Sequence, residues 1–339
     1  MSLYAGITSS SFKYSYFPSY SGIGIVNSKS SLILGLINIK IVIVTMLKQG
    51  SQSAGNFVLL LCKSTSETLR DNSNIKKISV HVPTHLKPLT DSDFGFYLAG
   101  LIEGDGHFIL FFSKKKEKTP QIVIVFNSLD ASLAYYIKGK LGFGNVYKIK
   151  QKKAVILVIS KLSGIEKVLN LISGKIRSQS KIDQINNNII THPFFGSFQP
   201  FSSSSVDLNN HWLTGFADAD ASFQIKIITR NNRTEVRLNF QIDQKKNDQL
   251  ILIKNYLGGN IGYRKSQDTY YYSSTSFGSA NNTVKHFDRF HLLSSKHINY
   301  LKWRKAYILI QNREHLNTGG IDKILKLKNS MNRSALFNK

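Results

Sequence analysis

The stretch Leu98–Phe108, LAGLIEGDGHF, recurs further along the chain as Leu213–Phe223, LTGFADADASF, so the two copies begin 213 − 98 = 115 positions apart. A second pair of similar stretches, LGFGNVYK from Leu141 and LGGNIGYRK from Leu257, is offset by 257 − 141 = 116 positions. An offset that stays nearly constant over two separate stretches indicates a duplicated domain and not a repeated tag.

Hydrophobic periodicity predicts the same order of elements in both copies, with a motif helix first, then two strands, a helix, two strands and a helix. In the first copy, we expect strands at 108–112, 121–126, 145–150 and 154–159 and helices at 131–141 and 165–172. In the second copy, we expect strands at 223–228, 235–242, 260–264 and 270–275 and helices at 248–257 and 282–290. The predicted fold class is therefore α+β, with two pseudo-symmetric αββαββα units.

The duplication divides the chain into an N-terminal extension of unknown role (1–89), a first domain (90–190), a linker (191–210) and a second domain (211–330). The linker is predicted to be flexible because it is rich in Pro, Gly and Ser. The extension has no counterpart in either copy, so we expect a poorly ordered or separately folded segment. Its longest apolar stretch is interrupted by Asn38 and Lys40 and is shorter than the ~20 residues of a membrane span, so no membrane partner is expected.

The net charge is the strongest signal in the composition. The chain has 45 Lys and Arg residues against 20 Asp and Glu, a formal net charge of +25, which indicates a polyanionic partner such as nucleic acid or an anionic membrane. The single cysteine, Cys62, excludes an internal disulfide framework and a cysteine-based zinc site. Abundant Ile, Asn and Lys are typical of an AT-rich coding sequence, which favours an organelle, the mitochondrion ahead of the chloroplast.

Small residues lie four positions apart in both motifs, at Gly100 and Gly104 in the first copy and at Gly215 and Ala219 in the second. Residues four apart share one face of a helix. A face of small side chains lets two helix backbones approach closely. We therefore expect the two motif helices to pack against each other.

Each motif helix ends in two acids, Glu103 and Asp105 in the first copy and Asp218 and Asp220 in the second. Once the helices pair, we expect these four carboxylates to converge, which is costly because like charges repel and a helix C-terminus disfavours anions. A divalent cation relieves that cost, and carboxylate oxygens suit Mg²⁺. Paired metal sites hydrolyse phosphodiesters, so two such sites would cut two strands. The alternative is that the acids only belong to helix-ending Asp-Gly turns.

The segments Leu98–Gly106 and Leu213–Ala221 resemble the signature of the LAGLIDADG homing endonucleases, in the single-chain form that carries two motifs. The resemblance covers about residues 90–330. It implies a site-specific enzyme, intron-encoded and organellar, that makes staggered double-strand cuts in a long DNA target with Mg²⁺ or Mn²⁺. It also implies that the two motif units pack through their helices and present saddle-shaped antiparallel sheets to DNA.

The resemblance assigns roles to the acids one by one. The last acid of each motif holds the catalytic metal in the family, which carries over to Asp105 and Asp220. The first acids, Glu103 and Asp218, are more often structural and take a secondary place. The residues predicted for the metal site are Asp105, Asp220, Gly104 and Ala219.

The resemblance also nominates two further catalytic side chains. The strand end FQIDQK resembles the one that supplies a Gln to the family's active site, which points to Gln244, and SSKH looks like the stretch that carries its active-site lysine, Lys296. The first copy has no Gln at the matching place, where Asp130 is a weaker analogue. A solvated surface lysine is the alternative for Lys296.

The second motif departs from the family pattern at Ala221, where the family usually has Gly. If this position requires a positive φ angle, an alanine there is strained. Such strain would loosen the placement of Asp220 and reduce cleavage.

Eight predicted strands would form two sheets that lie in successive stretches of the major groove, which admits a β-ribbon. Alternation in the second copy supports this, since polar and apolar residues occupy opposite faces. Phosphate contacts should make binding steeply salt-dependent. For the basic helix predicted at 300–307, contact with the DNA backbone and plain packing are both open. The residues predicted to bind DNA are Lys114, Lys116, Lys148, Lys150, Lys152, Gln224, Lys226, Arg230, Arg233, Arg237, Arg264 and Lys265.

Two alternatives to the nuclease remain at this point. One is an RNA maturase that assists splicing of its own intron, because the basic surface suits RNA as well as DNA. The other is a catalytically inactive DNA-binding relative, which Ala221 and the unmatched N-terminal region favour. The expected partners are double-stranded DNA and, for the maturase, intron RNA, bound by a monomer with internal pseudo-twofold symmetry.

Overall fold

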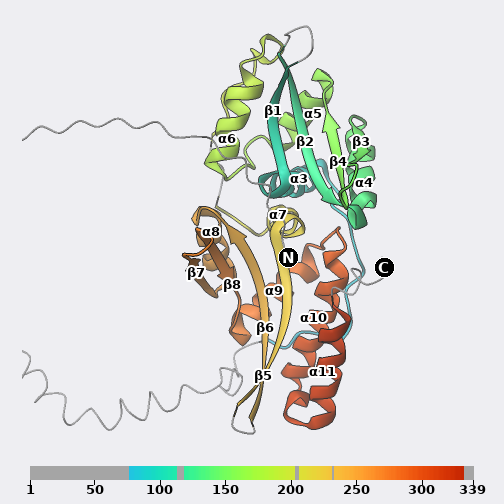
Figure 1. Ribbon diagram of the computed structural model, residues 1–339, viewed down its shortest axis with the longest axis vertical. Helices are drawn as coiled ribbons and strands as arrows, with labels where there is room; N and C mark the ends of the chain where they lie inside the picture. The colour runs from blue at the N-terminus through green and yellow to red at the C-terminus, as the bar shows by residue number, and fades with distance from the viewer. Residues whose placement is uncertain (1–75, 113–117, 203–205, 231–232, 332–339) are drawn as a thin grey trace, which may run out of the picture. The chain divides into compact units, whose positions relative to one another are not determined.

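The computed structural model describes residues 76–112, 118–202, 206–230 and 233–331 (Figure 1). None of the helices in these ranges has the length and apolar character needed to cross a membrane. The first repeat contains α3 (Asp91–Asp105), β1 (Gly106–Phe112), β2 (Lys118–Asn127), the 3-10 turn η2 (Ser128–Asp130), α4 (Ala131–Leu141), β3 (Asn145–Lys148), β4 (Ala154–Ile159), α5 (Leu162–Ile172), α6 (Gln179–Ile185) and the π-helical turn η3 (Asn186–Ile190). After the turn η4 (Pro193–Phe195), the second repeat contains α7 (Trp212–Asp220), β5 (Ala221–Arg230), β6 (Arg233–Gln244), α8 (Asp248–Leu257), β7 (Asn260–Arg264), β8 (Thr269–Ser273), α9 (Phe277–Arg289), α10 (Lys296–Gln311), η5 (Glu314–Leu316) and α11 (Thr318–Ser330).

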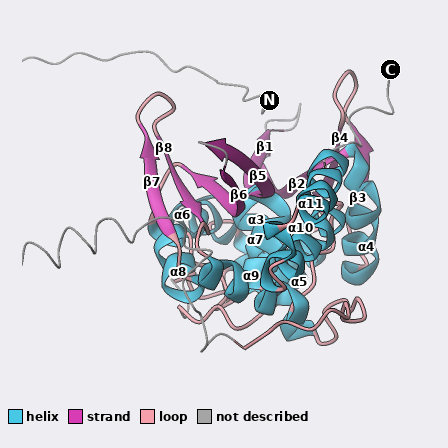
Figure 2. Ribbon diagram, turned by 90° about the horizontal axis from the view of Figure 1, so that it is seen from below, coloured by secondary structure: helices cyan, strands magenta, loops and turns pink. Residues whose placement is uncertain are grey.

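The two repeats build equivalent four-stranded antiparallel sheets, in the orders β1-β2-β4-β3 and β5-β6-β8-β7. The strands of both sheets lie along one side of the described unit, and most of the helices lie along the other (Figure 2). Apolar side chains at alternate strand positions, such as Phe108, Leu157 and Phe240, are buried against the helices. The expected α+β fold class with two αββαββα units is confirmed.

The two motif helices, α3 and α7, pack through their small residues. A Cβ added at Gly100 would lie 2.0 Å from the backbone oxygen of Trp212, and one added at Gly215 would lie 1.9 Å from the backbone oxygen of Tyr97. Since no side chain fits at such distances, the glycines set the separation of the two helices. The packing of the motif helices predicted from the sequence is confirmed.

Two aromatic residues at equivalent positions of the motif helices, Tyr97 and Trp212, form hydrogen bonds across the helix pair. The Tyr97 hydroxyl of α3 donates to Asp218 of α7 at 2.8 Å, and the Trp212 indole of α7 donates to Glu103 of α3 at 3.1 Å. Both contacts are buried. Each helix therefore supplies a hydrogen-bond donor to the first acid of the other motif.

The structure contains elements that were not predicted, chiefly α6, η3, α11 and the first turn of α10. The helix α6 and the turn η3 cover β1, the edge strand of the first sheet. The Phe108 amide donates to the Gln184 side chain at 3.3 Å, and the Asn188 side chain donates to the Phe108 carbonyl at 2.8 Å. This cover occupies backbone groups that an edge strand would otherwise expose.

The basic helix predicted at 300–307 is the central part of α10. Its aromatic side chains Tyr300, Trp303 and Tyr307 are buried with at most 1% exposure. The Lys302 ammonium donates to the Ser330 carbonyl at the end of α11, at 2.5 Å. Packing therefore accounts for the aromatic side chains of this helix and for Lys302, whereas Lys305 is exposed.

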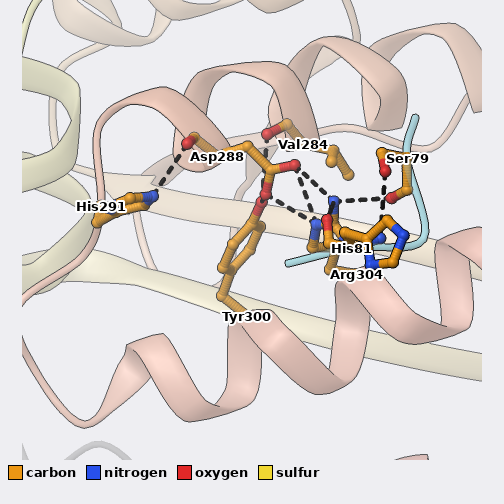
Figure 3. A network of polar contacts seen from close by, with 7 residues as sticks. All are labelled: Ser79, His81, Val284, Asp288, His291, Tyr300 and Arg304. Atoms are coloured by element: carbon orange, nitrogen blue, oxygen red, sulfur yellow. Dashed lines mark hydrogen bonds and ion pairs between the residues drawn. The ribbon is translucent and has the colours of Figure 1, made fainter. Parts of the chain in front are cut away.

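Residues 76–89, the described part of the N-terminal extension, attach to the second repeat. The buried Arg304 guanidinium donates to the carbonyls of Ser79 and His81, at 2.9 and 3.0 Å, and pairs with Asp288 at 2.8 Å (Figure 3). The Gln311 side chain bonds the backbone N–H and carbonyl of Ile78, at 2.8 and 2.9 Å. This segment ties the start of the first repeat to the last helices of the second, so the expectation of a poorly ordered or separate extension is wrong for it.

The linker packs against the protein at several points. Phe195 and Leu208 are buried with at most 1% exposure, and Phe201 is 9% exposed. The Asn186 side chain donates to the Phe201 carbonyl and accepts from its amide, at 3.1 and 2.8 Å. The expected flexibility is therefore not what the described part of the linker shows.

Candidate functional site

The last acids of the two motifs, Asp105 and Asp220, meet at the end of the helix pair. A Cβ added at Gly104 would lie 2.3 Å from the Ala219 Cβ and 3.0 Å from an Asp220 carboxylate oxygen, so this carboxylate lies directly beside the other motif helix. Burial, and then the charge of Asp220, raises the pKa of Asp105 to about 7. Burial also raises the pKa of Asp220. The site holds two carboxylates in an environment that disfavours their charge.

The first acids, Glu103 and Asp218, do not join this pair. Glu103 accepts from the Arg177 amide at 2.6 Å, and Asp218 accepts from the Leu293 amide at 2.8 Å and from the Ser294 hydroxyl at 2.5 Å. Burial raises the pKa of both acids, for Glu103 to about 7. The expectation that four carboxylates converge is therefore wrong, because two of them are held by hydrogen bonds from the loops behind the helices.

Lys296, at the start of α10, reaches the end of the second motif helix. Its ammonium donates to the Ala219 carbonyl at 2.6 Å and to the Ala217 carbonyl at 3.2 Å. Burial lowers its pKa, while Asp218, Asp220 and Asp105 raise it. These contacts argue against a solvated surface lysine. The Ala219 carbonyl, predicted to belong to the metal site, is engaged by this lysine.

A second buried lysine, Lys181 of α6, was not predicted from the sequence. It is 7% exposed, and its ammonium donates to the Gly106 carbonyl. Burial lowers its pKa, while Glu103, Asp220 and Asp105 raise it. The signal was present, because 296 − 181 = 115 is the offset of the two motifs and both lysines follow a serine.

The polar side chain next to the last acid of the motif differs between the two repeats. In the second repeat, the Gln244 amide donates to the Asp220 carboxylate at 2.6 Å. In the first repeat, Asp130 accepts instead from the Ser295 amide at 2.6 Å, which is the residue before α10. The two repeats thus differ here, with an amide that binds Asp220 in the second repeat and, in the first, an acid that accepts a hydrogen bond from the residue before α10.

Ala221 has ordinary backbone geometry. Its φ and ψ angles are −82° and 157°, and those of the equivalent Gly106 are −94° and 154°. The conditional strain considered for Ala221 is therefore absent. Gly106 is required for a different reason, since a Cβ there would lie 2.7 Å from the Ile102 Cα.

The pair Asp105 and Asp220 fits a hard divalent cation, because its buried carboxylate oxygens carry unfavourable negative charge that such an ion would offset. Within the described residues, no group of three or more His, Cys, Asp and Glu side chains offers a complete metal cage. Mg²⁺ often takes only one or two protein carboxylates and completes its shell with water and phosphate oxygens. The donor set therefore suits an ion shared with a phosphate substrate.

The predicted DNA-binding residues fall into three groups. Lys148 is exposed at the end of β3, Lys150 and Lys152 are exposed on the turn between β3 and β4, and Lys265 is exposed after β7. Lys226 and Arg237 are exposed cross-strand partners, and Gln224 next to them is half-buried. Arg264 pairs with Asp243 at 3.0 Å and stacks on the Tyr271 ring at 4.7 Å. Outside the described residues or side chains lie Lys114, Lys116, Arg230 and Arg233.

Two segments of the chain, residues 98–192 and 213–307, match the family described as LAGLIDADG endonuclease. The chain belongs to this family. A cox1 intron-2 protein of 37.2 kDa from Schizosaccharomyces pombe, named as uncharacterized, is 58% identical over 290 residues, 84% of this chain and 86% of the relative. The intron-encoded DNA endonuclease aI3 of Saccharomyces cerevisiae is 29% identical over 298 residues, 74% of this chain and 71% of the relative.

Solved structures with a similar fold include LAGLIDADG homing endonucleases bound to DNA. I-GzeII in complex with its DNA target has a TM-score of 0.58 at 19% identity, covering 70% of this chain and 98% of that one. I-SmaMI, bound to an uncleaved DNA target in the presence of calcium ions, has a TM-score of 0.55 at 20% identity, covering 73% of this chain and 99% of that one. The likeness establishes the shared fold.

Proposed function

We propose that this chain is a site-specific homing endonuclease that makes staggered double-strand cuts in a long DNA target and depends on a divalent metal ion. The observation that carries the proposal is the meeting of Asp105 and Asp220 at the end of a glycine-packed helix pair, with buried Lys181 on one side and half-buried Lys296 on the other. The net charge of +25 supports a polyanionic substrate. Relatives named after cox1 introns support an intron-encoded protein of the mitochondrion.

Asp105 and Asp220 would hold Mg²⁺ or Mn²⁺ beside Gly104 and Ala219. When bound, the metal supplies Lewis-acid stabilisation and a lowered pKa for an attacking water. Gln244 orients the Asp220 carboxylate through its 2.6 Å hydrogen bond.

The ammonium groups of Lys181 and Lys296 place positive charge where negative charge grows on the phosphate. Each lysine belongs to one repeat, so each strand of the duplex meets one. Both motif helices are on one polypeptide, and we therefore expect the active protein to be a monomer.

The test is a cleavage screen of a randomised double-stranded library with Mg²⁺. Wild type should yield staggered cuts, and Asp105→Asn should yield none, because the amide does not supply a carboxylate to the metal. Asp322→Asn, an exposed position of α11, is the matched control and should cut like wild type. No cutting by wild type, or equal cutting by Asp105→Asn, contradicts the proposal.

One relative supports a second candidate function. The intron-encoded RNA maturase bI4 of Saccharomyces cerevisiae is 26% identical over 224 residues, 62% of this chain but 34% of the relative. Splicing of the host intron by a doubly substituted Asp105→Asn, Asp220→Asn protein would favour the maturase, because that variant lacks both proposed metal ligands. The inactive DNA-binding alternative has lost its main support, since Ala221 is unstrained.

A further inference from the structure

The outer face of the first sheet, on the side away from the helices, carries a group of apolar side chains next to the polar residues His107, Thr119 and Gln121. Ile109, Phe111 and Tyr147 are 37%, 51% and 51% exposed there. Between them lie four half-buried branched residues of β2 and β4 that are adjacent by strand pairing: Val123, Val125, Ile156 and Val158. These side chains alternate with the buried ones of the same strands, so they do not belong to the core.

The second sheet carries polar side chains at most of the matching positions, and Gly262 stands where the first sheet has Tyr147. The pairing of Gly106 with Ile124 corresponds to that of Ala221 with Ile242, which aligns the two sheets strand by strand. On this alignment the matched pairs, first sheet before second, are Ile109 and Gln224, Phe111 and Lys226, Val123 and Gln241, Val125 and Asp243, Ile156 and Tyr271, and Val158 and Ser273. Gln121 and Asn239 keep an amide in both sheets. The two faces have thus diverged in chemistry while keeping one geometry.

The apolar face lies where a duplex would pass. The strand β1 begins at Gly106, directly after Asp105, just as β5 begins at Ala221, directly after Asp220. The end of β3 and the turn that joins it to β4 carry exposed Lys148, Lys150 and Lys152 at the margin of the same sheet. An apolar surface bordered by lysines suits a polyanion that carries its negative charge on the outside and exposes apolar groups in a groove.

We propose that the first domain recognises its half of the DNA target through the methyl groups of thymines, whereas the second domain reads its half by hydrogen bonds. In the major groove, thymine presents a C5-methyl group that apolar side chains contact, and the polar edges of bases are read by amide, Lys and Arg side chains. This inference rests on the proposed function and adds a composition to the target. The half-site under the first domain is rich in A·T pairs.

Deoxyuridine tests the inference, because it removes only the methyl group of thymine. On a target recovered from the library screen, thymines are replaced by deoxyuridine in one half-site at a time, and Kd is measured at fixed salt with Ca²⁺ present. Each methyl that loses an apolar contact should weaken binding about fourfold, from the transfer free energy of one buried carbon. The half-site under the first domain should show this loss, and the other half-site should change less than twofold.

Val123→Thr replaces a methyl group with a hydroxyl of similar shape on this face. The variant should bind the thymine target more weakly and lose part of the discrimination between thymine and deoxyuridine. Val80→Thr, an exposed position of the N-terminal segment, is the matched control and should retain both. Thermal melting of the variants separates these effects from misfolding.

Two results overturn the inference alone, and a third removes the proposed function with it. Equal deoxyuridine effects in the two half-sites, or none, would show that methyl contacts do not distinguish the domains. A dimer in solution that Val123→Thr dissociates would show that a second copy of the chain covers this face. Failure of wild type to bind any library member is a different outcome, because it removes the proposed function along with the inference.

Discussion

Substitution of Gly215 by alanine should separate the two motif helices. The added Cβ would lie 1.9 Å from the Tyr97 carbonyl oxygen, and an ordinary contact needs about 3.4 Å, so the helices must move apart by 3.4 − 1.9 = 1.5 Å. Both atoms belong to backbones, so a change of rotamer cannot relieve the clash. Overpacking of this kind costs about 1–3 kcal/mol of stability. A misplacement of about 1 Å at a catalytic centre lowers the rate about 100-fold, and we expect at least that for cleavage by Gly215→Ala.

The assay is single-turnover cleavage of a linear target with Mg²⁺, together with urea denaturation of the same protein. Gly139→Ala is the matched control, because Gly139 lies in α4 and a Cβ there meets nothing within 4 Å. This control should gain about 0.5–1 kcal/mol of stability and cut like wild type. If Gly215→Ala keeps wild-type stability and a cleavage rate within twofold of wild type, the glycine contacts between the motif helices do not position the acids.

Three further predictions concern the buried ion pair, a buried histidine and the metal. Arg304→Gln leaves the Asp288 carboxylate without its cationic partner and should cost about 3–5 kcal/mol in urea denaturation, whereas Lys323→Gln breaks an exposed pair and should cost less than about 1 kcal/mol. Burial lowers the pKa of His286 to about 3. Because the unfolded chain binds this proton more tightly, the free energy of unfolding should fall as the pH drops from about 6.5 towards 3, by up to about 5 kcal/mol. The fall should be smaller in His286→Gln. Asp220→Asn should abolish Mg²⁺-dependent cutting but keep DNA binding in a gel-shift assay, and a Kd more than tenfold weaker would contradict its assignment to chemistry.

The sequence predicted the parts of the fold that periodicity and duplication encode. The close approach of the motif helices followed from Gly100 and Gly215, and the helices at 131–141 and 248–257 have the bounds that their apolar spacing indicated. The alternation of β5 and β6 also placed Lys226 on the outer face.

Features that depend on backbone groups or on distant partners escaped prediction. The segment at 76–89 attaches largely through its carbonyls and amides, such as the Ser79 carbonyl, so its mostly exposed side chains carry little trace of the contact. Lys181 lies in a helix of seven residues whose apolar side chains are Ile182 and Ile185, and only the offset of 115 positions singles out the lysine. The direction of Glu103 was set by the Arg177 amide, which is distant in the sequence.

The two repeats have diverged where the packing leaves room and have stayed alike where it does not. Between the motif helices, Tyr97 and Trp212 each donate a hydrogen bond to the first acid of the other helix. Backbone oxygens lie so close to Gly100 and Gly215 that a larger residue at either position would push both acids apart. An outer strand position meets no such neighbour, so an apolar residue in one repeat and a polar one in the other leave the contacts between the motif helices undisturbed. A symmetric helix pair is thereby compatible with an asymmetric DNA target, because the glycine contacts that place the acids lie between the motif helices and the side chains proposed to read the bases lie on the outer faces of the sheets.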